Sequence, residues 1–269
     1  MNETGKPLII DCHTHIYPDK IAQKAADAIG SFYGIPMSMD GSLGTLLSAM
    51  DRSGVDKCLV CSAAVDAVHV RPVNDYIISA VKAHPDRLMG FGTLHPDLEN
   101  PGQELDYMLK NGLLGVKLHP DMQKFALEES RTEKLYAVCE GVCPMLLHTG
   151  DKRYHYSNPT QIPPILKKYP RLVLECAHLG GYSEWDDAVR CLIDTNVYVD
   201  CSSSFFAMND EKARELIMAY GEDRVLFGSD YPMWDMQKER ARLEGLGLPP
   251  EMMKKIYAGN ILKMLNIKQ

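Results

Sequence analysis

The sequence predicts an α/β protein built as a single (β/α)8 barrel that takes up residues 1–269. Short apolar runs alternate with stretches of helical periodicity, which is the pattern of parallel strands joined by helices. Eight such runs are present, and eight repeats favour a closed barrel over an open doubly wound sheet. The length agrees, because a barrel of this type needs roughly 250 residues and the chain has 269.

The expected strands are apolar almost without interruption, as strands buried on both faces of a parallel sheet must be. We expect them at Leu8–His15, Asp56–Ala63, Leu88–His95, Leu113–His119, Pro144–His148, Leu172–His178, Val197–Ser203 and Val225–Asp230. Most of these runs end in a polar residue, which predicts that polar side chains collect at one end of the barrel.

The expected helices fill the stretches between the strands and carry apolar residues on one face. We expect them at Ser42–Ser53, Val73–Ala83, Asn158–Tyr169, Asp210–Tyr220 and Pro249–Leu265. The longest irregular segment covers residues 16–41, after the first strand.

Within this irregular segment we expect a short helix at Ile21–Ile29 and a loop at Gly30–Asp40. Long loops in compact domains often act as lids over a functional site. Because the segment follows a strand, it is predicted to lie over the mouth of the barrel.

The composition excludes several classes of partner. The net charge is −7 and no basic run is present, so we do not expect nucleic acid to bind. No apolar stretch is long enough to cross a membrane, and residues 1–7 lack the apolar region of a signal peptide. Several of the eight cysteines fall in apolar runs and are interpreted as buried, reduced thiols. A cytoplasmic location is expected.

The ends of the expected strands carry the residues that suggest chemistry, as they do in barrel enzymes. Six of the nine histidines stand at or beside such ends. His13 and His15 are two residues apart, so both point to one side of their strand and can share a metal ion. His148 and Asp230, at the ends of the fifth and eighth strands, add further donors. A catalytic metal site of this kind keeps a position for water, whose pKa the metal lowers.

Four motifs follow one another along the chain: Asp11-Cys12-His13-Thr14-His15, His148, His178-Leu179-Gly180-Gly181 and Gly228-Ser229-Asp230-Tyr231-Pro232. In this order they resemble the amidohydrolase superfamily, and most closely its amidohydrolase-related branch, also called amidohydrolase 2. That branch contains hydrolases, lactonases and aminocarboxymuconate-semialdehyde decarboxylase-like proteins. The resemblance covers nearly the whole chain, since residues 257–262 are also similar to the last helix of the family.

The resemblance implies a role for each matching position. His13, His15, His148 and Asp230 are expected to bind one divalent metal ion, and zinc is the ion expected for these ligands. Asp230 is also expected to act as a base toward metal-bound water. His178 is expected to polarise a substrate carbonyl or to transfer a proton.

Further residues near the mouth are assigned to substrate binding. Lys117 stands on the fourth strand, where binuclear members of the superfamily carry a carboxylated lysine that bridges two metals. A paired ammonium or a substrate contact is favoured for Lys117, and a second metal remains an alternative. His119, Arg153 and Tyr17 are also assigned to the substrate, because a cationic and aromatic loop around Arg153 suits an anion. His95 is interpreted as closing its strand before a proline.

Two activities fit these residues. The sequence favours hydrolysis of a small, anionic amide, ester or lactone by metal-activated water. The alternative is metal-dependent, non-oxidative decarboxylation of a small unsaturated or aromatic acid, which needs arginine and stacking aromatics, and Arg153 is the only well-placed arginine. A non-catalytic metal-binding barrel is disfavoured because Asp230 and His178 form an acid–base pair. A homodimer is compatible with the sequence, which does not determine the oligomeric state.

Overall fold

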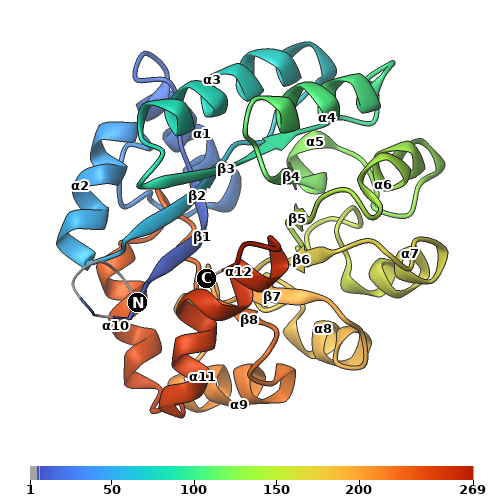
Figure 1. Cartoon of the computed structure of the whole chain (residues 1–269). Coiled ribbons are helices and arrows are strands. Elements are labelled where there is room, and N and C mark those ends of the chain that lie inside the picture. The colour runs from blue at the N-terminus through green and yellow to red at the C-terminus, as the bar shows by residue number, and fades with distance from the viewer. Residues whose placement is uncertain (1–4, 6, 269) are drawn as a thin grey trace.

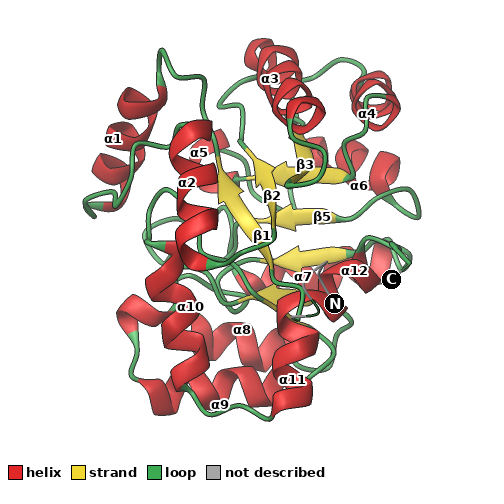
Figure 2. Cartoon of the chain, turned by 60° about the vertical axis from the view of Figure 1, so that its left-hand side comes forward, coloured by secondary structure: helices red, strands yellow, loops and turns green. Residues whose placement is uncertain are grey.

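The computed structural model describes residue 5 and residues 7–268 (Figure 1). The expectation that residues 1–7 hold no signal peptide falls largely on residues 1–4 and 6, which lie outside the described residues. In the described part of the chain, eight parallel strands follow one another around one sheet in the order β1 to β8. Helices surround this sheet (Figure 2), so the predicted (β/α)8 barrel is confirmed.

The strands are shorter than the predicted runs but lie within them. They are β1 (Ile10–His15), β2 (Lys57–Cys61), β3 (Leu88–Thr93), β4 (Gly115–Leu118), β5 (Met145–Leu147), β6 (Leu174–Cys176), β7 (Tyr198–Asp200) and β8 (Val225–Leu226). All except β1 end before the predicted run does. The polar residues at these ends leave the strand ladder and enter the loops at the mouth of the barrel.

The barrel closes where β1 meets the segment that follows β8. The backbone N–H of Cys12 donates to the carbonyl of Phe227 at 2.8 Å, and the N–H of Asp230 donates to the carbonyl of His13 at 2.8 Å. The register between β1 and β2 shifts between Asp11 and Thr14. Such an irregularity re-aims side chains, and here Cys12 joins the apolar interior while His13, the next residue, faces the mouth.

The helices pack around the outside of the barrel. The α-helices are α1 (Ala22–Tyr33), α2 (Leu43–Ser53), α3 (Val70–Ala83), α4 (Pro101–Lys110), α5 (Pro120–Gln123), α6 (Glu133–Cys139), α7 (Ile162–Lys168), α8 (Trp185–Leu192), α9 (Asp210–Tyr220), α10 (Met236–Gly245), α11 (Pro250–Lys254) and α12 (Asn260–Met264). Four short 3-10 helices are η1 (Ala67–His69), η2 (Ser130–Thr132), η3 (Pro159–Gln161) and η4 (Phe205–Ala207), and a π-helical turn is η5 (Lys255–Gly259).

Most predicted helices are present, with differences at their ends. The Ser42 side chain caps α2 by accepting the N–H of Thr45 at 3.3 Å, as a residue before a helix often does. The predicted last helix is interrupted by η5, and the helix predicted at Asn158–Tyr169 begins as η3. The prediction for the lid segment was wrong at one end, because α1 continues through Gly30 to Tyr33.

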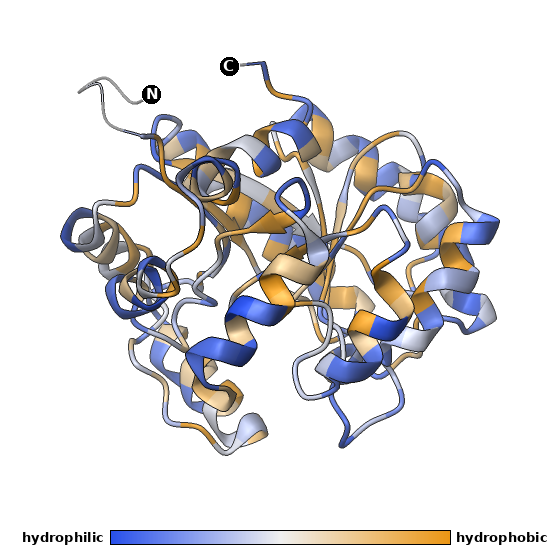
Figure 3. Cartoon of the chain, turned by 90° about the horizontal axis from the view of Figure 1, so that it is seen from below, coloured by the Kyte–Doolittle hydropathy of each residue, from blue (hydrophilic) through white to orange (hydrophobic). Residues whose placement is uncertain are grey.

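Two apolar layers stabilise the fold. The inner layer fills the barrel, and residues from opposite strands, such as Ile10, Phe91 and Leu146, are fully buried there. The outer layer lies between the strands and the helices and is larger. Figure 3 shows apolar residues along the central strands and many polar residues on the surrounding helices. The polar end of the barrel interior, above the inner layer, is therefore left for function.

The cysteines are mostly buried, and the helices are those of a barrel exterior. All eight cysteines are free and seven are buried, which agrees with their interpretation as small, buried side chains. The helices in the described part of the chain are too short or too polar for any of them to span a membrane.

Two of the loops at the mouth touch through glycine backbone. Gly150 follows β5 and has a φ of 78°, and an added Cβ would stand 2.4 Å from the Cα of Gly181, in the loop after β6. The N–H of Ser183 also donates to the carbonyl of Gly150 at 2.7 Å. A side chain at position 150 therefore meets both an unfavourable backbone conformation and a backbone clash.

We predict that Gly150→Ala lowers the free energy of unfolding by about 2–4 kcal/mol, since the left-handed backbone and the overpacking each contribute. Gly34→Ala is the matched control, because Gly34 has a φ of 69° with nothing within 4 Å of an added Cβ. The control should lose only the smaller backbone contribution in a denaturant titration. Equal losses for the two variants would show that the contact with Gly181 does not matter.

Candidate functional site

Three of the predicted metal ligands meet where β1 and the segment after β8 end. His13 Nε2 and His15 Nε2 are 3.2 Å apart, and Asp230 Oδ1 lies 3.3 Å from His15 Nε2 and 3.7 Å from His13 Nε2. A tetrahedral ion with bonds of about 2.0–2.2 Å separates its ligand atoms by about 3.4 Å. This triangle therefore fits a divalent metal ion, held by two imidazole nitrogens and one carboxylate oxygen.

The carboxylate of Asp230 is oriented by a chain of donors. Ser203 donates its hydroxyl to Asp230 Oδ2, and Trp234 Nε1 donates to Ser203 Oγ at 2.8 Å. Oδ1 is left to face the two imidazoles. Burial alone would raise the pKa of Asp230, but the neighbouring His13 and the hydrogen bond with His15 hold it well below its usual range. The group is therefore ionised and suited to bind a cation.

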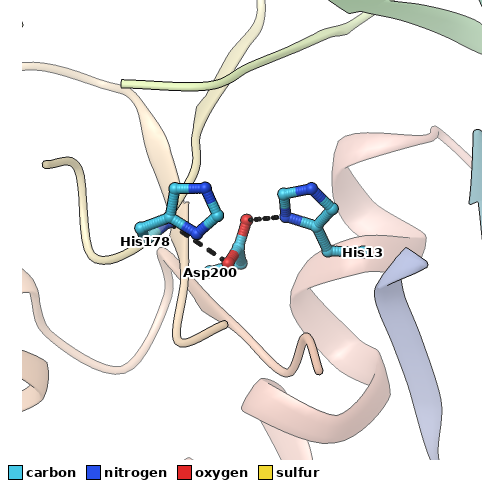
Figure 4. Close-up of side chains that lie close together, drawn as sticks. All are labelled: His13, His178 and Asp200. Atoms are coloured by element: carbon cyan, nitrogen blue, oxygen red, sulfur yellow. Dashed lines mark hydrogen bonds and ion pairs between the residues drawn. The ribbon is translucent and has the colours of Figure 1, made fainter. Parts of the chain in front are cut away.

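A second carboxylate lies behind His13. His13 Nδ1 is 3.1 Å from Asp200 Oδ2, while Asp200 Oδ1 accepts the backbone N–H of His178 at 3.3 Å (Figure 4). Because an ionised carboxylate only accepts, the proton of His13 resides on Nδ1 and the lone pair on Nε2. Burial, with a contribution from Lys117, lowers the pKa of His13 to about 4. The ring is therefore neutral, as a metal ligand must be.

We did not predict Asp200, although the sequence carries a signal for it. Burial alone would raise its pKa, yet His13 and the hydrogen bond between them keep the pKa below its usual value. Asp200 lies at the end of β7 and is fully buried. A carboxylate inside an otherwise apolar strand needs a buried partner, and this requirement pointed to an imidazole of the site.

His148, the predicted fourth ligand, lies beside the triangle rather than at one of its corners. Its Nδ1 is 2.9 Å from His178 Nε2, and its Nε2 faces Asp121 Oδ2 at 3.5 Å. His148, His119 and Asp121 form a neighbouring group whose possible ligand atoms all lie within 4.8 Å of one another. The structure thus brings together two groups of donors, which His178 connects.

His178 presents one nitrogen to this space. Its ring stacks on that of His13, with centroids 5.2 Å apart. Its Nδ1 lies 3.1 Å from the carbonyl oxygen of Ser202, which only accepts, so Nδ1 carries the proton and Nε2 the lone pair. Burial lowers the pKa of His178. The ring is thus held by its inner nitrogen, and the lone pair of Nε2 faces His148 Nδ1 at the inner end of the site.

Lys117 supplies a cation at the floor of the site. Its side chain is fully buried, and Nζ donates to His13 Nε2 at 2.9 Å. A metal ion would take the same lone pair of Nε2, so a bound ion would free Nζ for another partner. The side chain therefore points into the barrel, where a paired ammonium or a substrate contact is possible. A buried ammonium needs anionic partners, so a substrate carboxylate or oxyanion would find its partner here.

The lid helix α1 contacts the site through Tyr33. The hydroxyl of Tyr33 lies 2.8 Å from His119 Nε2, and His119 Nδ1 accepts the N–H of Met122 at 3.4 Å. Both nitrogens of His119 therefore have protein partners. We did not predict Tyr33 because the expected helix ended at Ile29. The signal was Gly34, since glycine in the left-handed region commonly ends a helix.

Arg153 lies outside the cavity lining and acts as a clamp for α1. Its Nη2 pairs with Asp151 Oδ2 at 2.6 Å, and its Nη1 donates to the carbonyl of Phe32 at 2.6 Å. The guanidinium thus has protein partners, and the substrate contact assigned to it stays a prediction. Tyr17 does line the cavity, whereas His95 accepts the N–H of Asp97 at 3.2 Å and closes its strand end.

Unfavourable backbone conformations cluster around the site. His178, Leu179, Ser203 and Asp230 have φ values between 44° and 63°, in the left-handed region that residues other than glycine rarely adopt. They all follow β6, β7 or β8. Such conformations persist where surrounding contacts enforce them, and they concentrate at functional sites.

A cavity of about 460 Å³ opens above the triangle. Its inner end gathers the ionisable side chains that the barrel supplies, which are His13, His15, Lys117, His119, His148, His178 and Asp230. Its outer walls come largely from apolar residues of segment 16–41 and of α3. The arrangement can hold a metal ion, bind an anion and move a proton beside an apolar space.

Comparisons with known proteins agree with the barrel fold. The family model described as amidohydrolase matches residues 10–267. A comparison with curated proteins finds no match. Among solved structures, an uncharacterised TIM-barrel protein from Bordetella bronchiseptica is 20% identical, with a TM-score of 0.78, and the match covers 96% of this chain and 98% of that one.

Two further solved structures are decarboxylases. Dihydroxybenzoic acid decarboxylase from Polaromonas, with bound manganese and 2-nitroresorcinol, is 16% identical over 98% of each chain, with a TM-score of 0.76. The 5-carboxyvanillate decarboxylase from Novosphingobium aromaticivorans, with manganese and 4-hydroxy-3-methoxy-5-nitrobenzoic acid, is 19% identical, with a TM-score of 0.75, over 99% of this chain and 97% of that one. At these identities the likeness shows the shared fold.

We predict that Asp200→Asn weakens binding of a divalent metal by about 10–100-fold, because an amide no longer fixes the proton of His13 on Nδ1. Competition against a chelating dye measures this affinity on the purified protein without any assay of turnover. Asp194→Asn, at an exposed position before β7, is the control and should bind the metal like the unchanged protein. An unchanged affinity in Asp200→Asn would remove Asp200 from the metal centre.

Proposed function

The chain belongs to the amidohydrolase family, and from this premise we propose that it is a metal-dependent decarboxylase of a small aromatic or unsaturated carboxylic acid. The observation that carries the proposal is the buried ammonium of Lys117, at the floor of a largely apolar cavity and 2.9 Å from His13 Nε2. It supplies the cation that a substrate carboxylate needs, in line with the substrate contact considered for Lys117 from the sequence.

Decarboxylation replaces hydrolysis as the favoured reaction. Hydrolysis was favoured because arginine was scarce near the expected site, and the position of Lys117 removes that objection. The two manganese-containing decarboxylases of the same fold give further support. They also make manganese a candidate beside zinc for the triangle of His13, His15 and Asp230.

The metal triangle, Lys117 and His178 each have a part in the proposed reaction. A bound metal would supply positive charge that polarises and orients a substrate oxygen. Lys117 would hold the substrate carboxylate. His178, when protonated, would donate from Nε2 to the carbon that bears the carboxylate, and its lowered pKa makes it a stronger acid. That proton forms the new C–H bond with the electron pair of the breaking C–C bond, and carbon dioxide leaves.

The apolar walls assist this step. The substrate loses a charged carboxylate and releases neutral carbon dioxide, so surroundings that solvate charge poorly favour the product side. Aromatic side chains also border the inner end, where the ring of Tyr33 lies 6.1 Å from that of His148 and 5.1 Å from that of Tyr182, measured between centroids. A flat substrate ring would pack against such groups.

We predict that the protein releases carbon dioxide from a hydroxybenzoate only when it is loaded with a divalent metal. Protein stripped with a chelator and reloaded with manganese or zinc would be assayed for carbon dioxide with 2,6-dihydroxybenzoate and its monohydroxy relatives. In heavy water the product should carry one deuterium at the former carboxyl position. Turnover of aryl esters or lactones without carbon dioxide release from any acid would instead establish the hydrolase.

We predict that His178→Asn retains its metal but releases carbon dioxide about 10²–10⁴-fold more slowly, because a positioned proton donor contributes a factor of this size. His155→Asn, in the exposed loop after β5, is the control and should keep the full rate. Metal content measured on the same samples separates the loss of a proton donor from the loss of the ion. A variant at position 178 with full metal and full rate would require another donor.

A further inference from the structure

On the basis of the proposed function, we infer that the substrate is a monoanion with an apolar arm, an alkyl chain or a second ring, which lies along α1 and α3. The cavity of about 460 Å³ falls within the roughly 300–1,000 Å³ of sites that hold drug-sized ligands. An acid with one small ring, held at the ionisable inner end, leaves the outer part of this cavity unfilled. The side chains there determine what fills it.

One wall of the outer part is a single face of α1. Ala25 and Ile29 stand four residues apart, so they project from one side of the helix. Ile21, directly before the helix, lines the cavity with them. A second wall comes from α3, where Val73 and Tyr76 line the same cavity. These side chains offer an incoming group mainly apolar surface.

The rim of the cavity is also apolar where it is open to solvent. Ile21 is 49% exposed and Val65, in the loop after β2, is 55% exposed, and both belong to the lining. Large apolar side chains exposed beside a site gain free energy when a ligand removes them from water. A substrate arm that reaches the rim would cover both.

The charges of the cavity limit the substrate to one anionic group. Of the described residues that line it, Lys117 is the sole lysine and none is an arginine. At the rim, His69 already pairs with Asp66 at 2.7 Å. A carboxylate on the arm would be buried without a cation, which is costly. The inner end therefore takes the anion, and the arm is uncharged.

The test measures binding without turnover. The probes are 2-nitrophenols with hydrogen, ethyl, butyl or carboxyethyl at ring carbon 4, because a nitro group cannot leave as carbon dioxide. Calorimetry with the manganese-loaded protein should show the dissociation constant falling roughly fourfold for each methylene added, and the carboxyethyl probe should bind more weakly than the ethyl probe. Affinity independent of chain length, preference for the carboxyethyl probe, or no binding by any probe would overturn the inference.

Variants on α1 locate the arm. Ala25→Trp fills the space beside α3 and should abolish the gain in affinity per methylene. Ala28→Trp, at a more exposed position of the lining, provides the same test if Ala25→Trp does not fold. Lys24→Trp, on the solvent side of the same helix, should retain the full gain. If both cavity variants retain it, the arm does not lie along α1 and the inference is wrong.

The outcome is separable from that of the proposed reaction. If the protein releases carbon dioxide but its affinity for the probes does not depend on their chain length, only the inference of an apolar arm is overturned. Affinity that rises with chain length, in a protein that releases no carbon dioxide from any acid, supports the arm and contradicts the decarboxylation.

Discussion

The closed ring of parallel strands imposes the constraint on which the site depends, because it directs eight separate strand ends to one mouth. The inner apolar layer fills the barrel below that mouth, so polar side chains above it must satisfy one another. The contact of Asp200 with His13 shows how this is achieved, since a buried carboxylate sets the proton of a buried imidazole. The same carboxylate accepts the backbone N–H of His178 and so ties β7 to the loop after β6.

The periodicity of the sequence was enough to predict the barrel. The polar ends of the runs were enough to predict that His13, His15, His148 and Asp230 gather at one mouth, although His148 lies beside the triangle of the other three. Other features depend on contacts between distant segments. His13 and Asp200 are 187 residues apart, and only the pairing of strands around the ring brings them together. Arg153 was assigned to substrate binding because its loop is cationic and aromatic. In the structure its guanidinium forms an ion pair with Asp151, two residues away.

The polar and the apolar parts of the site come from different segments of the chain. Strand ends supply the imidazoles and carboxylate of the triangle, the amine of Lys117 and Nε2 of His178, and strand pairing positions their backbone. Segment 16–41 and α3 supply most of the apolar walls. Tyr33 joins the two parts, because it extends from α1 to His119 at 2.8 Å. The shape of the cavity can thus be specified separately from the groups that act within it.

The clamp between Arg153 and Phe32 has a consequence for how such a protein diversifies. It anchors α1 near its carboxyl-terminal end, whereas three of the positions that line the cavity, Ile21 just before the helix and Ala25 and Ile29 within it, lie nearer its beginning. Mutations there alter neither the anchor nor the strand ends. Descendants of a common ancestor can therefore come to accept new substrates through a few substitutions in and beside one surface helix, while they inherit the same reaction.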